Sequence, residues 1–288
     1  MNRWVVGARL RTLPAAVVPV AIGASVGAGQ HGARWWTVAP ALVVSLALQV
    51  GVNYANDYSD GVRGTDDVRV GPVRLVASGL APAGSVKRAA FASFAVAGVA
   101  GLVLAATTSW WLLLVGAASV LAGWFYTGGS HPYGYLGLGE VFVFVFFGLV
   151  ATVGTTYVVL ERIPAAAWWL GSGAGALACS LLVINNLRDI PTDSQVGKRT
   201  LAVRLGDGRT RWLYVALIAA AFAMVVVVAA SDRAPVLIAL AAVVAAVPPV
   251  RLVLARASGR ELIAVLAATG KLQLAYGLLV TVGMIFAR

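Results

Sequence analysis

Apolar runs of about 20 residues recur along the whole chain, and each is long enough to cross the hydrocarbon core of a bilayer as a helix. The composition agrees with this pattern, because 60% of the 288 residues are hydrophobic and only 11% are charged, whereas a soluble domain has about 25% charged residues. A soluble core cannot absorb that much apolar surface. The sequence therefore predicts an all-α integral membrane protein, with one membrane-embedded domain covering residues 1–288.

Nine transmembrane helices are expected, at about 20 residues per crossing. They cover residues 13–29, 35–56, 88–107, 109–126, 140–160, 166–187, 212–230, 235–254 and 264–286. Pro191 predicts an end or a kink in the sixth helix, and Pro248 and Pro249 predict the same near the end of the eighth. The N-terminal residues contain no evident cleavable signal and are interpreted as an interfacial segment before the first span.

The basic residues orient this array of helices. Of the 22 Lys and Arg residues, only Arg34, Arg162, Arg233 and Arg288 fall on the side opposite the N-terminus. By the positive-inside rule, the N-terminus and the polar site are predicted to face the cytoplasm, in a multi-pass protein of the inner or plasma membrane. Tryptophan pairs at 35–36, 110–111 and 168–169 open helices on the outer face, as expected for an aromatic belt at the headgroups.

The acidic residues also concentrate on the side of the membrane that is predicted to be cytoplasmic. Seven of the 11 follow the second and sixth predicted helices: Asp57, Asp60, Asp66, Asp67, Asp189, Asp193 and Asp207. Asn53 and Asp57 align with Asn185 and Asp189 at an offset of 132, and the tryptophan pairs repeat at an offset of 133. This correspondence predicts an internal duplication of a multi-helix unit, which is a common plan among membrane proteins.

Each aligned pair has the i,i+4 spacing that puts two side chains on one helix face. Asp60 joins the first face if its helix continues through Gly61, and Asp193 is expected to reach the site from a loop or a new turn beyond Pro191. Carboxylates clustered at one membrane depth repel one another, and Mg²⁺ relieves this repulsion because it binds carboxylate oxygens and bridges to phosphates. Nearby basic residues complete a receptor for a diphosphate: Arg63, Arg74, Arg188, Lys198 and Arg199.

The two stretches that contain these residues resemble the aspartate-rich motifs of the UbiA-type intramembrane prenyltransferases. Five segments, about a third of the chain, resemble in particular the 1,4-dihydroxy-2-naphthoate polyprenyltransferases of menaquinone synthesis: RTLPAAVVPV (11–20), NDYSDGVRGTDD (56–67), GPVRLVASG (71–79), YTGGSHPYGYLGLGEVFVFVFFGLVATVGTTY (126–157) and NNLRDIPTDSQVGKRTLAVRLG (185–206). One departure is visible, because the first motif of the superfamily uses four-residue steps, whereas here the step from Asp57 to Asp60 is three residues.

The resemblance implies an enzyme that transfers a polyprenyl group from an allylic polyprenyl diphosphate to 1,4-dihydroxy-2-naphthoate, with loss of CO₂ and diphosphate, to give a demethylmenaquinol. It implies Mg²⁺ as the cofactor. The implied catalytic and metal-binding residues are Asp57, Asp189 and Asp193, with Asp60 as a further metal ligand. The implied diphosphate-binding residues are Asn53, Arg74, Asn185, Arg188, Lys198 and Arg199. Tyr126 is the candidate contact for the aromatic substrate, and Glu140 is interpreted as a helix N-terminal acid without a catalytic role.

Other functions stay open at this point. A 4-hydroxybenzoate or haem-type prenyltransferase would carry the same motifs, and a cation-coupled transporter would also contain a repeat with polar clusters. The start of a CDP-alcohol phosphotransferase motif is present at residues 57–61, but residues 62–85 do not continue it. The net charge of +11 is assigned to lipid headgroups and an anionic substrate, and not to nucleic acid. Prenyl chain length, the group that binds the naphthoate carboxylate and the oligomeric state are not predicted.

Overall fold

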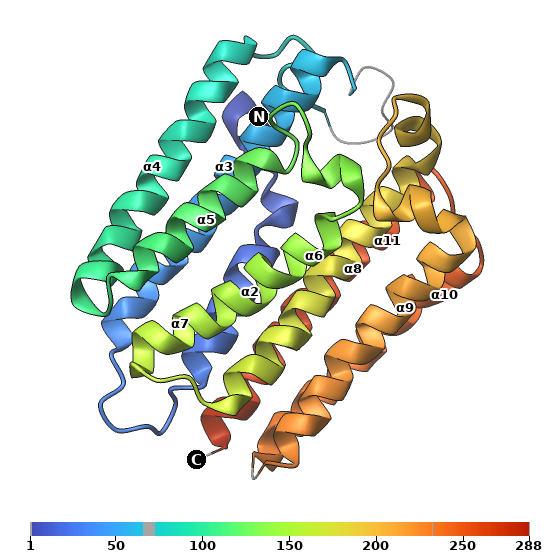
Figure 1. Cartoon of the computed structure of the whole chain (residues 1–288). Coiled ribbons are helices and arrows are strands. Elements are labelled where there is room, and N and C mark those ends of the chain that lie inside the picture. Colours follow the sequence, from blue (N-terminus) through green and yellow to red (C-terminus); the bar gives the residue numbers. More distant parts are fainter. Residues whose placement is uncertain (1, 66–72, 232, 288) are drawn as a thin grey trace.

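The computed structural model describes residues 2–65, 73–231 and 233–287, and these ranges form helices and turns without a β-strand (Figure 1). The helices run roughly alongside one another, so that the loops gather at two opposite ends. The α5–α6 loop and the α8–α9 turn lie at the upper end in Figure 1, near the N-terminus, and the C-terminus lies at the other end. The predicted all-α class is therefore confirmed.

The elements follow one another in this order: α1 (Arg3–Ala8), η1 (Leu10–Thr12), α2 (Pro14–Ser25), η2 (Trp35–Thr37), α3 (Val38–Arg63), α4 (Ala83–Thr107), α5 (Trp111–Phe125), η3 (Tyr133–Leu136), α6 (Gly139–Val143), η4 (Phe144–Val150), α7 (Ala151–Leu160), α8 (Ala165–Gln195), α9 (Leu201–Ala229), η5 (Ala234–Ala242), α10 (Val243–Leu254) and α11 (Glu261–Phe286). The segment η4 is a π-helical stretch that joins α6 to α7 in one continuous span.

Seven helical spans in the described ranges are long and apolar enough to cross a membrane. They cover residues 35–63, 83–107, 139–160, 165–195, 201–229, 234–254 and 261–286. The N-terminal helices form a further pair, Arg3–Thr12 with Pro14–Ser25, bent by 50° at the break, and the apolar helix α5 has 15 residues. The fold is thus that of an integral membrane protein, and the count of nine crossings stays a prediction.

An end or a kink was predicted at Pro191 and at Pro248–Pro249, and the ends do not occur, because both helices continue past their prolines. Helix α8 continues through Pro191 to Gln195, and α10 continues through its two prolines to Leu254. A membrane helix tolerates proline where neighbouring groups satisfy the freed backbone. In α8 the hydroxyls of Thr192 and Ser194 add hydrogen bonds to the carbonyls of Asp189 and Ile190, which reinforce the turn around Pro191. Asp193 consequently lies on the same helix as Asp189, one turn further on, and not in a loop.

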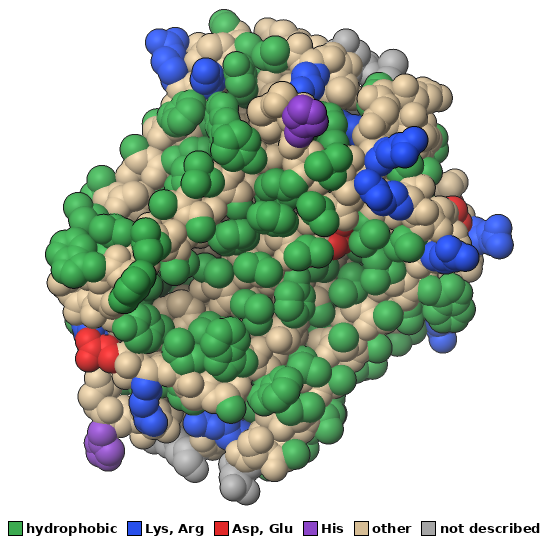
Figure 2. All heavy atoms as spheres, in the orientation of Figure 1, with side chains coloured by type: hydrophobic (Ala, Val, Ile, Leu, Met, Phe, Trp, Pro, Cys, Tyr) green, Lys and Arg blue, Asp and Glu red, His purple; other side chains and the backbone are tan. Residues whose placement is uncertain are grey.

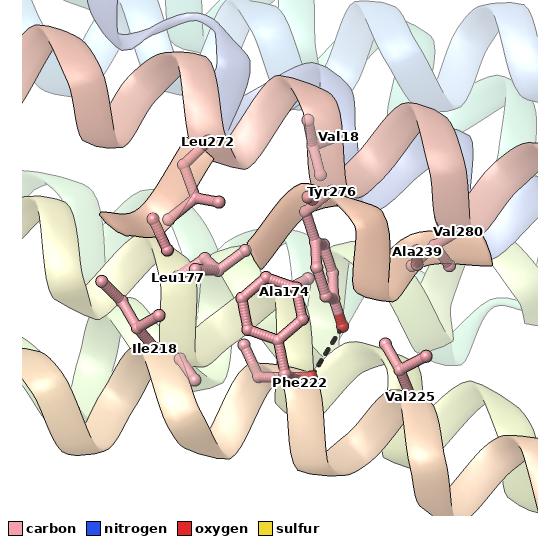
Figure 3. Close-up of a cluster of buried hydrophobic side chains, with 14 of the residues drawn as sticks. Val18, Ala174, Leu177, Ile218, Phe222, Val225, Ala239, Leu272, Tyr276 and Val280 are labelled. Atoms are coloured by element: carbon pink, nitrogen blue, oxygen red, sulfur yellow. Dashed lines mark hydrogen bonds between the residues drawn. The ribbon is translucent and has the colours of Figure 1, made fainter. Parts of the chain in front are cut away.

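A large apolar cluster joins α2, α8, α9, η5 and α11 (Figure 3). At its centre the Tyr276 hydroxyl of α11 donates a hydrogen bond of 3.0 Å to the Ala221 carbonyl of α9, and the Tyr276 ring lies edge-on to Phe222 at 5.6 Å between centroids. The hydroxyl would otherwise be an unsatisfied polar group in an apolar interior, which is costly. This cluster holds the C-terminal helices against α2 and α8, two helices that border the cavity described below.

Glycine allows a close helix contact between η4 and α8. A Cβ atom built on Gly148 would lie 2.5 Å from the Gly175 Cα atom and 2.8 Å from the Gly171 carbonyl oxygen. Lipid-embedded helices lack a strong hydrophobic force between them and associate through such close packing of small residues.

The face shown in Figure 2 is apolar over most of its height. Hydrophobic side chains cover the middle of the face shown, and Lys and Arg side chains gather toward its margins. All six residues of the tryptophan pairs are 43–74% exposed, so these pairs do not pack in the core. Exposed tryptophans at helix ends suit the interface between hydrocarbon and headgroups.

Candidate functional site

A cavity of about 1950 Å³ lies among α2, α3, α4, α5, α7, α8 and α11. Most of its wall is apolar and comes from residues such as Val44, Leu48, Leu104, Val120 and Val158. Polar and charged side chains gather at the part bounded by the ends of α3 and α8: Asn53, Asn56, Asp60, Arg74, Asn185, Asn186, Arg188, Asp189, Asp193 and Lys198. The cavity can therefore hold a ligand with a charged head and a long apolar portion.

Helix α3 contributes Asn56 and Asp60 to the polar end, because it continues through Gly61 to Arg63, beyond the predicted end at residue 56. The Asp60 carboxylate accepts a 2.7 Å hydrogen bond from the Tyr135 hydroxyl and lies 3.5 Å from Lys198 Nζ. The Asn56 amide oxygen accepts a 2.9 Å hydrogen bond from Thr127. Two residues of the α5–α6 segment thus hold the acidic end of α3 in place.

Asp57 is oriented differently from Asp60. It is fully buried, it is not part of the cavity wall, and its two carboxylate oxygens accept hydrogen bonds of 2.9 and 3.0 Å from the backbone amides of Leu75 and Val76. A carboxylate that accepts backbone amides is well suited to fix a loop. The structure therefore places the predicted metal ligand Asp57 against the loop before α4.

The predicted partner of Asp57, Asn53, does line the cavity but also anchors the N-terminal helices. Its amide nitrogen donates to the Ala8 carbonyl and to the Thr12 hydroxyl, each at 2.9 Å. Its amide oxygen accepts from Gln49 at 3.3 Å. Asn53 thus ties α1 and η1 to α3 at the edge of the cavity.

Helix α8 brings Asn185, Arg188, Asp189 and Asp193 together at the cavity, as the sequence predicts. Arg188 makes a bidentate pair with Asp189, with both N–O distances at 2.7 Å, and it also donates to the Asn185 amide oxygen at 2.9 Å. This planar fork is the preferred geometry between a guanidinium and a carboxylate. Asn185 and Asp189 repeat on α8 the four-residue spacing that Asn56 and Asp60 have on α3.

Of the predicted diphosphate ligands, the cationic residues Arg74, Arg188 and Lys198 line the cavity. Arg199 is exposed and lies outside the wall, where its backbone amide donates to the Tyr135 carbonyl. Arg63 is likewise outside, and its guanidinium donates to the carbonyls of Thr127 and Gly129. These two arginines shape the loops around the site.

Tyr135 was not among the predicted site residues, yet it connects several of them. Its hydroxyl reaches Asp60, and Lys198 Nζ lies 4.7 Å from its ring centroid. Burial, and secondly the charge of Asp60, raise the pKa of this phenol above its usual value. Tyr135 therefore stays protonated at neutral pH and acts as a hydrogen-bond donor.

Aromatic residues form one wall of the cavity. Tyr126 lies edge-on to Tyr133 at 5.5 Å, and Tyr133 stacks on Phe142 at 3.9 Å between centroids. All three residues line the cavity together with Phe146. The predicted position of Tyr126 at the site is consistent with this wall, which offers flat faces to a planar ring.

The oxygen donors around the polar end suit a hard divalent cation. Asp60, Asp189 and Asp193, with the amide oxygens of Asn56 and Asn185, are the ligand types that Mg²⁺ takes. Within the described ranges no three His, Cys, Asp or Glu side chains are close enough to form a ready-made metal site. The predicted residues Asp66 and Asp67 lie outside the described ranges, and Asp207 forms a bidentate pair with Arg211 away from the cavity.

Sequence reasoning missed Asn56, Asn186 and Tyr135. The signal for Asn56 was present, because Asn56 and Asp60 have the same spacing as Asn185 and Asp189. The stretch NYANDYSD contains two Asn-to-Asp steps of four residues, and only the cavity distinguishes them. No local pattern marked Tyr135, which lies in a loop and meets Asp60 through the tertiary structure alone.

The UbiA prenyltransferase family model matches residues 16–264. The chain is 51% identical to the 1,4-dihydroxy-2-naphthoate octaprenyltransferase of Mycobacterium tuberculosis, over 99% of this chain and 98% of that protein. It is 54% identical to the protein of the same name from Mycobacterium leprae, over 86% of this chain and 85% of that one. A UbiA homologue from Archaeoglobus fulgidus, solved with GPP and Mg²⁺, shares the fold with a TM-score of 0.69 and 15% identity, over 98% of this chain and 100% of that one.

Proposed function

The chain belongs to the UbiA prenyltransferase family, and we propose that it transfers a polyprenyl group from an allylic polyprenyl diphosphate to 1,4-dihydroxy-2-naphthoate. The observation that carries the proposal is the cavity, whose charged end and long apolar remainder match the two parts of a prenyl diphosphate. The choice of acceptor is supported by the mycobacterial relatives, which are named for dihydroxynaphthoate and not for 4-hydroxybenzoate or haem.

The diphosphate would lie at the polar end of the cavity. Arg74 and Lys198 would bind its oxygens, with Arg188 beside them. Asp60, Asp189 and Asp193, with Asn56 and Asn185, would hold Mg²⁺, which when bound supplies positive charge that stabilises the departing diphosphate. We place Asp60 ahead of Asp57 in this set because Asp60 lines the cavity.

The prenyl tail would occupy the apolar part of the cavity between α3, α4, α5 and α7. This wall excludes water from the reacting carbon, which an allylic cation requires because water would otherwise capture it. The aromatic wall around Tyr126 and Tyr133 would hold the naphthoate ring against the end of the tail.

The reaction balances without an added oxidant or reductant. The bond between the allylic carbon and the diphosphate oxygen breaks, and its electron pair leaves with diphosphate. The ring carbon that bears the carboxylate forms the new C–C bond to the allylic carbon. The bond from that ring carbon to the carboxylate then breaks, CO₂ leaves, and the electron pair restores the aromatic ring, giving a demethylmenaquinol.

The site is proposed to face the cytoplasm of the inner or plasma membrane. The loops at the polar end carry most of the basic residues, whereas the exposed tryptophan pairs open helices at the other end. This arrangement is the one that the positive-inside rule favours.

The deciding experiment supplies the detergent-purified protein with Mg²⁺, a polyprenyl diphosphate and either 1,4-dihydroxy-2-naphthoate or 4-hydroxybenzoate. The prenylated naphthol is expected from the first acceptor, with one CO₂ released per product when the carboxyl carbon is isotopically labelled. Turnover of 4-hydroxybenzoate with none of the naphthoate would overturn the assignment of the acceptor.

A further inference from the structure

Glu140 is an acidic side chain buried beside the cavity for which the reaction above has no use. It lies at the start of α6 and is 8% exposed. Its Oε1 atom accepts a 3.0 Å hydrogen bond from the Asn186 amide nitrogen, and its Oε2 atom has no hydrogen-bond partner among the described residues. An ionisable side chain within a membrane span is expensive, and such residues usually serve a function.

Glu140 lies in the first turn of α6, as expected for a helix N-terminal acid, and the remaining surroundings of its side chain are apolar. It borders a small apolar pocket of about 270 Å³, which is separate from the main cavity. The other residues of that pocket are Val141, Phe144, Cys179, Leu201, Leu213 and Leu217. Asn186 is therefore the only side chain with a hydrogen bond to the Glu140 carboxyl group in the described part of the chain.

This hydrogen bond determines which way the Asn186 amide points. A carboxylate can only accept, so the nitrogen of the amide must face Glu140. Asn186 is 6% exposed and lines the main cavity, whereas Glu140 does not. The Asn186 amide oxygen has no hydrogen bond within the described ranges. It can therefore accept a hydrogen bond from a ligand in the cavity.

Tyr126 borders the same part of the cavity. A Cβ atom built on Gly139, the neighbour of Glu140, would lie 3.2 Å from the Tyr126 ring, 3.4 Å from its hydroxyl oxygen and 3.3 Å from Leu182. Leu182 is one helical turn before Asn186 on α8 and also lines the cavity. Tyr126 and Asn186 therefore flank one region, beside the aromatic wall.

We propose that Asn186 and Tyr126 bind the ring hydroxyl groups of the acceptor, and that Glu140 is a positioning residue that holds the Asn186 amide in its accepting orientation. This inference rests on the proposed function, because it assumes a dihydroxylated aromatic acceptor. The acceptor hydroxyls are donors, and an oriented amide oxygen and a phenol oxygen can accept from them. A site built in this way rejects a ring that lacks a hydroxyl, since its buried polar groups are then left unpaired.

The test compares the wild-type protein with Glu140→Gln, Asn186→Leu and the double variant. A glutamine can donate as well as accept, so it no longer imposes one orientation on Asn186. For Glu140→Gln and Asn186→Leu, we expect the KM for dihydroxynaphthoate to rise about tenfold, with the KM for the prenyl diphosphate changed less than about twofold. The double variant should equal Asn186→Leu, because Glu140 acts through Asn186.

Cys179→Ala is the matched control. The Cys179 thiol contacts the backbone carbonyl of Glu140 at 3.1 Å without lining the main cavity, so this variant should keep the wild-type KM values. A second measurement uses 1-hydroxy-2-naphthoate and 4-hydroxy-2-naphthoate as competitive ligands. The wild-type protein should bind at least one of them about tenfold more weakly than the full acceptor, and Asn186→Leu should lose that preference.

The outcomes separate this inference from the proposed function. If the wild-type protein does not prenylate dihydroxynaphthoate, the proposed function itself fails. If the wild-type protein does prenylate dihydroxynaphthoate, two results for the Glu140→Gln and Asn186→Leu variants would mean that these residues serve only the fold. One is an equal rise in the KM values for both substrates, and the other is a lowered melting temperature with unchanged KM values. Wild-type binding that is indifferent to both ring hydroxyls would also overturn the inference, even if a variant did not fold.

Discussion

Asp57 and Asp60 lie one turn apart on α3, yet only the Asp60 side chain lines the cavity. Asp60 lines the cavity and accepts a hydrogen bond from Tyr135, whereas Asp57 accepts two backbone amides of the loop at 75–76. The two residues are therefore a natural pair for separating a functional carboxylate from a structural one by the same substitution.

Asp57→Asn should lower stability more than activity. The asparagine keeps one acceptor oxygen but turns an N–H group toward the second backbone amide, which costs about 1–3 kcal/mol. Asp60→Asn should instead reduce turnover by on the order of 10²–10³ with little change in melting temperature. Thermal melts and turnover of the two purified variants check this pair. Abolished turnover in Asp57→Asn with an unchanged melt would show that Asp57 acts at the reacting centre.

Asp60 and Asp189 should act as a unit. If both carboxylates hold cations against one departing diphosphate, each single Asn variant loses on the order of 10²–10³ in turnover, and the double variant is scarcely slower than either single one. Turnover rates of the three variants, measured at saturating substrate, decide the matter. Losses that multiply would mean that the two carboxylates stabilise separate events.

Activity should depend on a divalent cation. Excess EDTA is expected to stop turnover, and Mg²⁺ added beyond the chelator should restore it. A binding measurement gives an independent reading, since geranyl diphosphate should raise the melting temperature more in Mg²⁺ than in EDTA. Full turnover in excess EDTA would remove the cation from the mechanism.

Two glycines of the span 139–160 should respond oppositely to alanine. At Gly148 the added methyl group meets the backbone of α8, whereas at Gly154 no other atom lies within 4 Å of the added Cβ. Gly148→Ala should therefore destabilise the protein by about 1–3 kcal/mol, and Gly154→Ala should be neutral or stabilise it by up to about 1 kcal/mol. Thermal melts in one detergent provide the comparison. Equal melting temperatures would argue against the close contact between η4 and α8.

The orientation can be tested with single cysteines. Cys179 is the only cysteine of the chain and is buried, so the wild-type protein should stay unlabelled by an impermeant maleimide. Ser130→Cys and Ser194→Cys, both exposed near the polar end, should be labelled only in inside-out vesicles. Ser231→Cys, in the turn that ends α9, should be labelled in intact cells. The reverse pattern would invert the proposed topology.

The sequence alone determined the class of fold and the end of the molecule at which the polar groups gather. Hydropathy and loop charge are local properties that act through the solvent, so apolar runs predict membrane helices without knowledge of their neighbours. The sequence placed Asn185, Arg188 and Asp189 close together on one helix, and the structure brings all three to the cavity wall. The continuation of α8 through Pro191 was not predicted, because proline within a sequence usually indicates a helix end. In a membrane protein, neighbouring groups can bind the backbone carbonyl that the proline leaves free, so the helix can continue.

Only the tertiary structure decided which acidic residues face the cavity. The stretch from Asn53 to Asp60 supports two registers of the same four-residue spacing, and helix periodicity alone does not say which face is turned inward. The loop amides of Leu75 and Val76 bind Asp57, while Tyr135 and Lys198 from two other segments meet Asp60. These partners are remote in sequence, so the choice between the two aspartates depends on packing that brings distant segments together.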